Sequence, residues 1–229
     1  MAHILHLETA THLCSVALAR DGVVLATRDL MSAGFSHAEK LNVFIDEVLK
    51  ETDVTMKELN AVAVGIGPGS FTGLRIGLSA AKGLCYALDM PIMGVGTLDT
   101  LVSALRASGH TQAGPVLWPM VDARRMEVFT QCIDGAEKSG PMPLLLSAEW
   151  VAGLDKSKEH FVFGDGADKA ADLFAGVPHV KHLAGIRPVA SAMCGLASDR
   201  FQRAAFDDLA YLVPFYGKEA GVTMAKKSI

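Results

Sequence analysis

The residues best suited to bind a ligand lie in the glycine-rich stretch Gly65 to Gly77, which reads GIGPGSFTGLRIG. An apolar run typical of a buried strand, Ala61 to Val64, precedes it. Ser70 and Thr72 are both suitable N-caps for a helix, and no proline follows until Pro91. A strand, a glycine turn and a helix in this order point backbone N–H groups outward at a helix N-terminus, where a phosphate binds well.

The known nucleotide-binding signatures do not match this turn. A Walker A loop needs a glycine, four residues and then Gly-Lys-Ser/Thr, but counting from Gly67 places Thr72 at the second glycine position. The dinucleotide fingerprint needs a third glycine where Ser70 or Thr72 stands. Two interpretations remain open: a phosphate site outside these signatures, or a turn that packs a helix tightly against a strand.

Two further segments carry side chains of the kind that bind phosphate. Glu8-Thr9-Ala10-Thr11 follows the first apolar run, where actin-like ATPases place an acid and hydroxyls around phosphate and Mg²⁺, although a single acid in a surface turn is more often solvated. The arginines of Asp122-Ala123-Arg124-Arg125 either bind phosphate or lie in solvent at a hairpin tip. Glu8, Ser70 and Thr72 are the residues that could contact a cofactor, but they are weak candidates. We expect the protein to bind no cofactor.

The histidines and serines form no recognisable metal-binding or catalytic set. His3 and His6 are three residues apart, a spacing that puts them on opposite faces of a strand. The other close pair, His179 and His182, has no acid-plus-histidine cluster around it. The sequence also lacks a Gly-x-Ser-x-Gly nucleophile elbow. We therefore expect neither a metal site nor a catalytic residue.

The helix predicted from Thr72 to Leu88 has two apolar stripes. The second stripe is made of larger residues and suits the chain's own sheet: Leu74, Leu78, Ala81, Cys85 and Leu88. The first stripe is made mainly of small residues, which let another backbone approach closely: Gly73, Gly77, Ala80, Leu84 and Ala87. A helix with this pattern must be covered on two sides, so it needs a second helix from this chain or from a partner.

Composition places the chain among folded globular proteins. Its 229 residues are 50% apolar and 20% charged, enough to bury a core. The net charge of −4 argues against a free-standing nucleic-acid binder, which needs clustered lysine and arginine. The four cysteines are scattered, and no apolar run approaches the roughly 20 residues of a membrane span. We expect a soluble, cytoplasmic protein with no signal peptide and no membrane contact.

The first half of the chain reads as an α/β unit. Three antiparallel strands are predicted over His3–Leu7, Cys14–Arg20 and Val23–Leu30, with an Asp21-Gly22 hairpin turn between the last two. A helix capped by Ser36, with Glu39 completing a capping box, runs to Lys50 and leaves Val43 outside. The strand, glycine turn and small-residue helix follow. A strand at Met90–Val95 and a helix capped by Thr97 complete a parallel crossover.

The second half is patterned more weakly. A loose stretch from Ala107 to Pro115 predicts a boundary between two units, 1–107 and 108–229, with a tail that packs back on the first. The elements expected beyond it are paired strands at Val116–Val121 and Met126–Cys132, a loop at Gly135–Pro143, a short helix capped by Ser147, a strand at Phe161–Gly164, and helices at Ala167–Phe174 and Val189–Phe206.

Several stretches of the sequence together resemble the bacterial TsaB (YeaZ) family. The run GPGSFTGLR from Gly67 to Arg75 is the most specific of them. The likeness also covers Ile4–Ala10, Cys14–Leu18, Ser79–Leu84, Gly94–Leu98, Val121–Phe129 and, thinly, Gly164–Ala167. One departure is Glu8-Thr9-Ala10, where the family usually has Asp-Thr-Ser. The lost hydroxyl weakens any claim of ATP binding.

The resemblance implies a two-lobed actin-like fold (ASKHA, ribonuclease H-like) with mixed central sheets. It implies a non-catalytic subunit in making threonylcarbamoyladenosine beside the anticodon of tRNAs that read codons starting with A. The implied partners are the catalytic paralogue TsaD, as a heterodimer, and the ATPase TsaE, with tRNA bound only through the complex. When the chain is alone, we expect its helix surface to pair with itself in a homodimer.

The implied contact surface is a bundle built from the first two helices. Its predicted residues are His37, Lys40, Val43, Phe71, Gly73, Arg75, Gly77, Ala80, Leu84 and Ala87. The main alternative is an ATP-dependent phospho- or carbamoyltransferase of the actin-like class, which needs a metal-holding acid and a second phosphate loop. A peptidase is a third alternative, for which the sequence offers no nucleophile–base pair.

Overall fold

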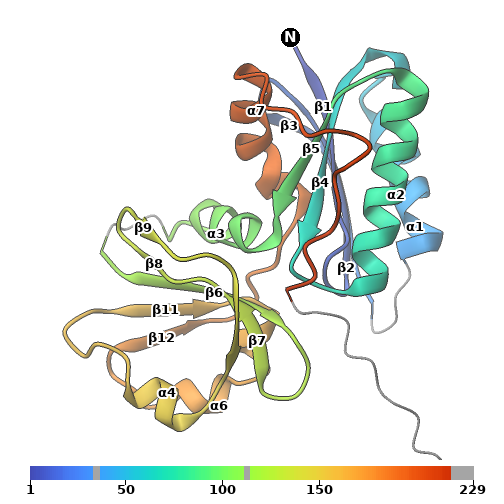
Figure 1. The fold of residues 1–229 in the computed structure, drawn as a ribbon. Coiled ribbons are helices and arrows are strands. Elements are labelled where there is room, and N and C mark those ends of the chain that lie inside the picture. The colour runs from blue at the N-terminus through green and yellow to red at the C-terminus, as the bar shows by residue number, and fades with distance from the viewer. Residues whose placement is uncertain (33–36, 111–113, 218–229) are drawn as a thin grey trace, which may run out of the picture.

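The computed structural model describes residues 1–32, 37–110 and 114–217, which form two sheets with helices packed against them (Figure 1). The first sheet has five strands in the order β3-β2-β1-β4-β5. They are β1 (His3–Glu8), β2 (Leu13–Arg20), β3 (Val23–Met31), β4 (Leu59–Gly67) and β5 (Ile92–Gly96). Because β1 pairs antiparallel with β2 and parallel with β4, the sheet is mixed, as predicted.

The local turn chemistry explains how the first sheet begins. Asp21 and Gly22 both have positive φ, 50° and 82°, as a two-residue hairpin between twisted strands requires. Along β1, Leu5 and Leu7 face one side of the sheet, while Ile4, His6 and Glu8 face the other, as alternation along a strand dictates. All five side chains are buried, so both faces of this strand must be covered.

Helices cover both faces of the first sheet. On the side of Leu5 and Leu7 lie α1 (His37–Glu51) and α2 (Phe71–Leu88), side by side in Figure 1. The opposite side is covered by the 3₁₀ turn η2 (Ala190–Met193) and by α7 (Cys194–Gln202). The predicted Ser70 cap of α2 is confirmed, because its Oγ accepts a hydrogen bond from the Gly73 N–H at 3.2 Å. The Ser36 cap predicted for α1 lies outside the described residues.

The second sheet, also mixed, has the order β10-β7-β6-β11-β12, with β8 paired to β6 and β9 paired to β8. Its strands are β6 (Val116–Asp122), β7 (Glu127–Thr130), β8 (Ile133–Asp134), β9 (Glu137–Lys138), β10 (Met142–Leu145), β11 (His160–Phe163) and β12 (Val180–Leu183). The remaining elements are η1 (Met56–Glu58), α3 (Thr97–Ala107), α4 (Ala148–Ala152), α5 (Asp165–Asp168) and α6 (Ala171–Phe174).

The chain visits the first sheet twice. After β12 it returns, and η2 and α7 pack on β1, β2 and β5. Asp207 then pairs with Ile92, and the Phe215 N–H donates to the Ile66 carbonyl at 2.7 Å. The division of the chain into the units 1–107 and 108–229 stays a proposal. Residues 190–217, which belong to the second of these units, pack on the first sheet.

Several predicted boundaries are corrected by the structure. Gly96, not Thr97, is the N-cap of α3, because the helix already begins at Thr97. The loop predicted at 135–143 contains β9 and the start of β10, strands too short to show an alternating pattern. The helix predicted over 167–174 is divided into α5 and α6, and that over 189–206 into η2 and α7.

None of the helices within the described residues combines the length and the apolar character that a membrane crossing requires.

Candidate functional site

The turn between β1 and β2, residues 9–12, lies against the start of α2 and is tied to it. The Ser70 N–H donates to the Ala10 carbonyl at 2.7 Å. The Thr9 hydroxyl donates to the Gly73 carbonyl at 2.8 Å, although the two residues are 64 positions apart. The bond from Thr9 is buried, where the effective dielectric is low and a lost partner is costly. We call this turn the helix clasp.

The helix clasp also holds the first turn of α1. The ring nitrogen Nε2 of His37 donates to the Thr11 carbonyl at 2.9 Å. His37 is fully buried, and burial lowers the pKa of its imidazole. A single short turn therefore fixes the N-termini of α1 and α2 relative to each other.

Part of the predicted partner stripe faces the helix clasp instead of the surface. A Cβ on Gly73 would overlap the Thr9 carbonyl, and one on Gly77 would overlap the Thr9 hydroxyl. Both glycines are buried, as is His37. We therefore remove Gly73, Gly77 and His37 from the predicted contact surface, because the close approach that the small residues permit is made by the chain's own turn.

The other predicted contact residues are more accessible. Lys40 and Val43 on α1 are exposed, and so are Phe71, Arg75 and Ala87 on α2. Ala80 and Leu84 are half-buried against the core of the first sheet.

The outermost arc of α2 runs through Thr72, Ile76, Ser79, Gly83 and Ala87, of which only Ala87 is among the predicted contact residues. Thr72, Ser79 and Gly83 are exposed, and Ile76 beside them is half-buried. A Cβ on Gly83 would meet no atom within 4 Å. The 3.6-residue period alone could have identified this arc, as the one opposite Leu74, Leu78, Ala81 and Cys85.

Glu8 lies beneath the helix clasp and is fully buried. Its Oε1 accepts from the Ala10 N–H at 2.7 Å, while Oε2 finds no hydrogen-bond partner among the described residues. Burial raises the pKa of this carboxyl from 4.5 to about 7. His6, on the same face of β1, is equally buried, and burial lowers the pKa of its imidazole from 6.5 to about 4.

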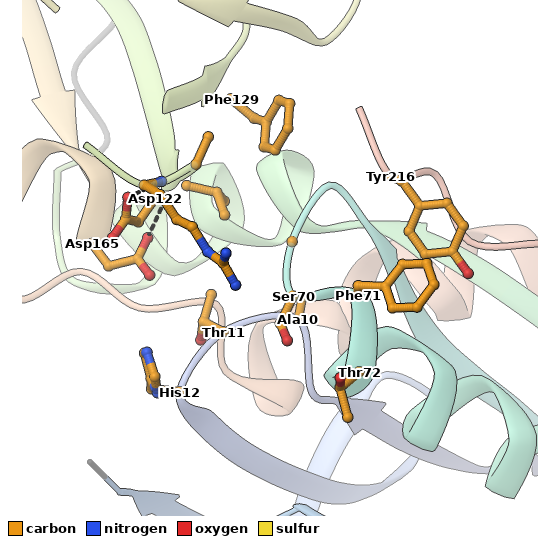
Figure 2. A pocket seen from close by; sticks show the side chains of 14 residues that line it. Ala10, Thr11, His12, Ser70, Phe71, Thr72, Asp122, Phe129, Asp165 and Tyr216 are labelled. Atoms are coloured by element: carbon orange, nitrogen blue, oxygen red, sulfur yellow. Dashed lines mark hydrogen bonds between the residues drawn. The ribbon is translucent and has the colours of Figure 1, made fainter. Parts of the chain in front are cut away.

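A cleft of about 450 Å³ lies between the helix clasp, the start of α2 and the second sheet (Figure 2). Of the three weak cofactor-binding candidates, Ser70 and Thr72 line it and Glu8 does not. The Ser70 hydroxyl is already engaged as the N-cap of α2. The lining residues are Ala10, Thr11, His12, Gly69, Ser70, Phe71, Thr72, Val121, Asp122, Ala123, Arg124, Phe129, Asp165 and Tyr216.

The far wall of the cleft carries both signs of charge. The Asp122 carboxylate accepts from the Arg124 N–H at 2.7 Å and pairs with the Lys169 ammonium group. The Asp165 carboxylate accepts from the Asp122 N–H at 3.1 Å (Figure 2), and burial raises its pKa. Arg124 lines the cleft from the turn between β6 and β7. Within the described ranges, no group of three His, Cys, Asp or Glu side chains is arranged to hold a metal ion.

Comparison with known proteins gives consistent relatives. Residues 32–139 match the model of the family described as TsaD, tRNA N6-adenosine threonylcarbamoyltransferase. The chain is 39% identical over 127 residues to the tRNA threonylcarbamoyladenosine biosynthesis protein TsaB of Escherichia coli, covering 55% of this chain and 52% of that protein. It is 31% identical over 164 residues to TsaB of Bacillus subtilis, covering 70% of this chain and 69% of that protein.

The solved structures agree with this result. YeaZ from Pseudomonas aeruginosa superposes with a TM-score of 0.76 at 27% identity, over 94% of this chain and all of the other. The predicted fold class, an actin-like α/β fold with mixed sheets, is thereby confirmed. The chain spans about half the length of the E. coli relative in the sequence match.

Proposed function

The chain belongs to the TsaB (YeaZ) family, and from that premise we propose that it serves tRNA threonylcarbamoyladenosine biosynthesis as a non-catalytic subunit. In this role it binds and activates a TsaD-type transferase, with the ATPase TsaE joining the complex. The modified base is the adenosine beside the anticodon of tRNAs that read codons starting with A. The tRNA contacts the chain only through the complex, the chain alone forms a homodimer, and the complex works in the cytoplasm.

The observation that carries the proposal is the outward arc of α2. Gly83 at its centre has open space where a side chain would stand. Ser79 and Ala87, also exposed, are small, so a helix of a partner can approach the α2 backbone closely. Val43 of α1, 45% exposed, adds an apolar side chain to the same helix pair.

The hydrogen bonds and the burial in the helix clasp favour a structural role for this turn over phosphate binding. Its Ala10 has no hydroxyl, and the hydroxyl of its Thr9 already donates to the Gly73 carbonyl. Glu8, the acid that a metal-dependent transferase would use, is buried beneath the turn and bonded to the Ala10 N–H. The clasp thus positions α1 and α2, which form the proposed partner surface.

The experiment is a modification assay with purified TsaD-type and TsaE-type proteins, with and without this chain. We expect threonylcarbamoylated tRNA only when the chain is present and co-purifies with the transferase. A Gly83→Arg variant should lose both properties, because a large side chain then stands where the partner helix approaches. Modification at the full rate without the chain would overturn the proposal.

The enzyme alternative has its own discriminating test. The cleft holds Ser70, Thr72, Asp122 and Asp165, residue types that an ATP-dependent transferase of this fold would employ. Calorimetric titration of the isolated chain with Mg-ATP should give no micromolar binding under our proposal. Micromolar binding accompanied by turnover would favour the phospho- or carbamoyltransferase.

A further inference from the structure

Residues 207–217, here called the strap, return from α7 along the first sheet and α2 (Figure 1, red). At the start of the strap, the Asp207 N–H donates to the Ile92 carbonyl at 3.0 Å and its carboxylate accepts from the Gly94 N–H at 2.6 Å. Near its end, Phe215 is bonded to Ile66 through the backbone. These bonds hold both ends of the strap on the sheet.

The strap runs antiparallel to α2. The Lys82 ammonium donates to the Ala210 carbonyl at 3.1 Å, late in α2. Early in α2, the Phe71 ring lies 4.8 Å from that of Tyr216. The strap turns at residues 208–212, where the Leu212 N–H donates to the Asp208 carbonyl at 2.9 Å, and it continues to Tyr216 as irregular chain.

The Arg75 guanidinium strengthens the contact between Phe71 and Tyr216. The Arg75 Nε donates to the Tyr216 hydroxyl at 2.9 Å, and its guanidinium lies 3.8 Å from the centroid of the Phe71 ring. The strap is therefore a fixed flank of α2, opposite to the flank that α1 covers.

Exposure alternates along the strap from Tyr211 to Tyr216, which gives it an apolar outer face. Leu212 packs into the core of the first sheet. The residues that alternate with it stay in solvent: Tyr211 is 82% exposed, Val213 67% and Phe215 43%. Three large apolar side chains in a row on a fixed segment indicate a surface that is covered in the working protein.

This outer face is continuous with the arc of α2 that we propose binds the partner. Gly83 and Tyr86 share one surface groove with Leu209 and Ala210 of the strap. Tyr86 is 84% exposed. A partner side chain that enters this groove beside Gly83 therefore contacts the strap as well as α2.

We propose that the strap is part of the partner-binding surface, and that the protein seated on α1 and α2 covers Tyr211, Val213 and Phe215 with apolar side chains of its own. The inference rests on the proposed function, because it assigns the strap to the same partner. The surface so defined is wider than a helix bundle alone, as a specific interface of roughly 1,600 Å² in total requires.

The test compares Val213→Asp with Leu145→Asp as a matched control. Leu145 is 61% exposed on β10, at the edge of the other sheet, so each variant places one charge on an exposed apolar site. Binding to the TsaD-type partner is measured by titration, and melting temperatures are recorded. We expect Val213→Asp to raise the Kd at least tenfold at an unchanged melting temperature, and Leu145→Asp to leave the Kd unchanged.

Gly83→Arg separates this inference from the proposed function. If Gly83→Arg abolishes binding while Val213→Asp binds as the wild type does, the strap proposal fails and the proposed function stands. If the wild-type chain does not bind the partner, or Gly83→Arg binds it unchanged, the proposed helix face fails instead. If Val213→Asp only converts a homodimer to monomers, as seen by light scattering, the occupant is a second copy of this chain and the strap proposal is overturned.

Discussion

A side chain on Gly65 would collide with Glu8, since an ideal Cβ there lies 2.5 Å from the Glu8 Oε2 atom. Glycine at this position of β4 thus makes room for a glutamate at the end of β1. The two residues are a matched pair, and the carboxylate they accommodate holds the helix clasp through the Ala10 N–H.

This pairing predicts a non-additive pair of substitutions. Gly65→Ala should destabilise the fold by about 1–3 kcal/mol, because an extra methyl group enters a packed site. Glu8→Asp, which shortens the side chain by one methylene, should recover part of that loss in the double variant. Urea unfolding of the wild type, both single variants and the double variant measures the coupling. Additive losses would show that the two residues do not share this space.

Glu8 also predicts a pH dependence of stability. Its pKa in the folded chain, about 7, lies above the ordinary 4.5, so the folded state binds more protons between these values. The free energy of unfolding therefore falls as pH rises from 4.5 to 7, by roughly 3 kcal/mol for a fully buried group. His6 acts in the opposite sense, because its folded pKa of about 4 lies below 6.5 and stability rises between these values.

Single substitutions should separate the opposite pH dependences that Glu8 and His6 give to the free energy of unfolding. Glu8→Gln keeps an oxygen for the Ala10 N–H and removes the loss of stability that deprotonation of Glu8 causes. The free energy of unfolding of this variant should therefore rise between pH 4 and 6.5. His6→Asn removes the gain of stability that deprotonation of His6 causes. The free energy of unfolding of this variant should therefore fall between pH 4.5 and 7. Urea unfolding at half-unit pH steps measures both. Parallel curves for wild type and both variants would contradict these assignments.

Thr9→Val should loosen the start of α2 specifically. The substitution keeps the shape of the side chain and removes the hydrogen bond to the Gly73 carbonyl, a loss of about 1 kcal/mol. Thr100→Val is the matched control, since Thr100 is equally buried and its hydroxyl donates to the Gly96 carbonyl at 3.1 Å. Hydrogen exchange should accelerate in the first turn of α2 for Thr9→Val alone. Equal acceleration there in both variants would mean that only global stability changed.

The position of Gly77 changes what its substitution should do. The sequence places Gly77 in the predicted contact surface, where a substitution would affect pairing first. In the structure the new side chain would overlap the Thr9 hydroxyl, so Gly77→Leu should lower the melting temperature markedly. Ala80→Arg, at a half-buried position, should weaken pairing with a smaller loss of stability. Thermal unfolding and size-exclusion chromatography separate the two effects.

Local signals in the sequence were sufficient for much of the fold. The Asp21-Gly22 turn, the Ser70 cap and the alternating strands each depend on neighbouring residues, and the structure confirms all three. The orientation of the small-residue stripe depends on Thr9, which is 64 positions from Gly73. No periodicity within α2 carries that information.

The arrangement of the strap also could not be predicted from local signals in the sequence. Tyr211 to Phe215 read as an irregular tail broken by proline and glycine, and their alternation acquires meaning only beside α2. Ser70 and Thr72 line the cleft and Glu8 does not, because the burial of Glu8 depends on Gly65 in another strand.

The most direct test of the account is titration of a TsaD-type transferase with the wild-type chain, Gly83→Arg and Gly195→Arg. Both glycines are exposed positions in helices with open space at Cβ, one on α2 and the other on α7, across the first sheet. Arginine favours a helix over glycine, so neither substitution should unfold the chain. We predict wild-type affinity for Gly195→Arg and a loss of at least tenfold for Gly83→Arg. Equal affinities for the two variants would contradict the account.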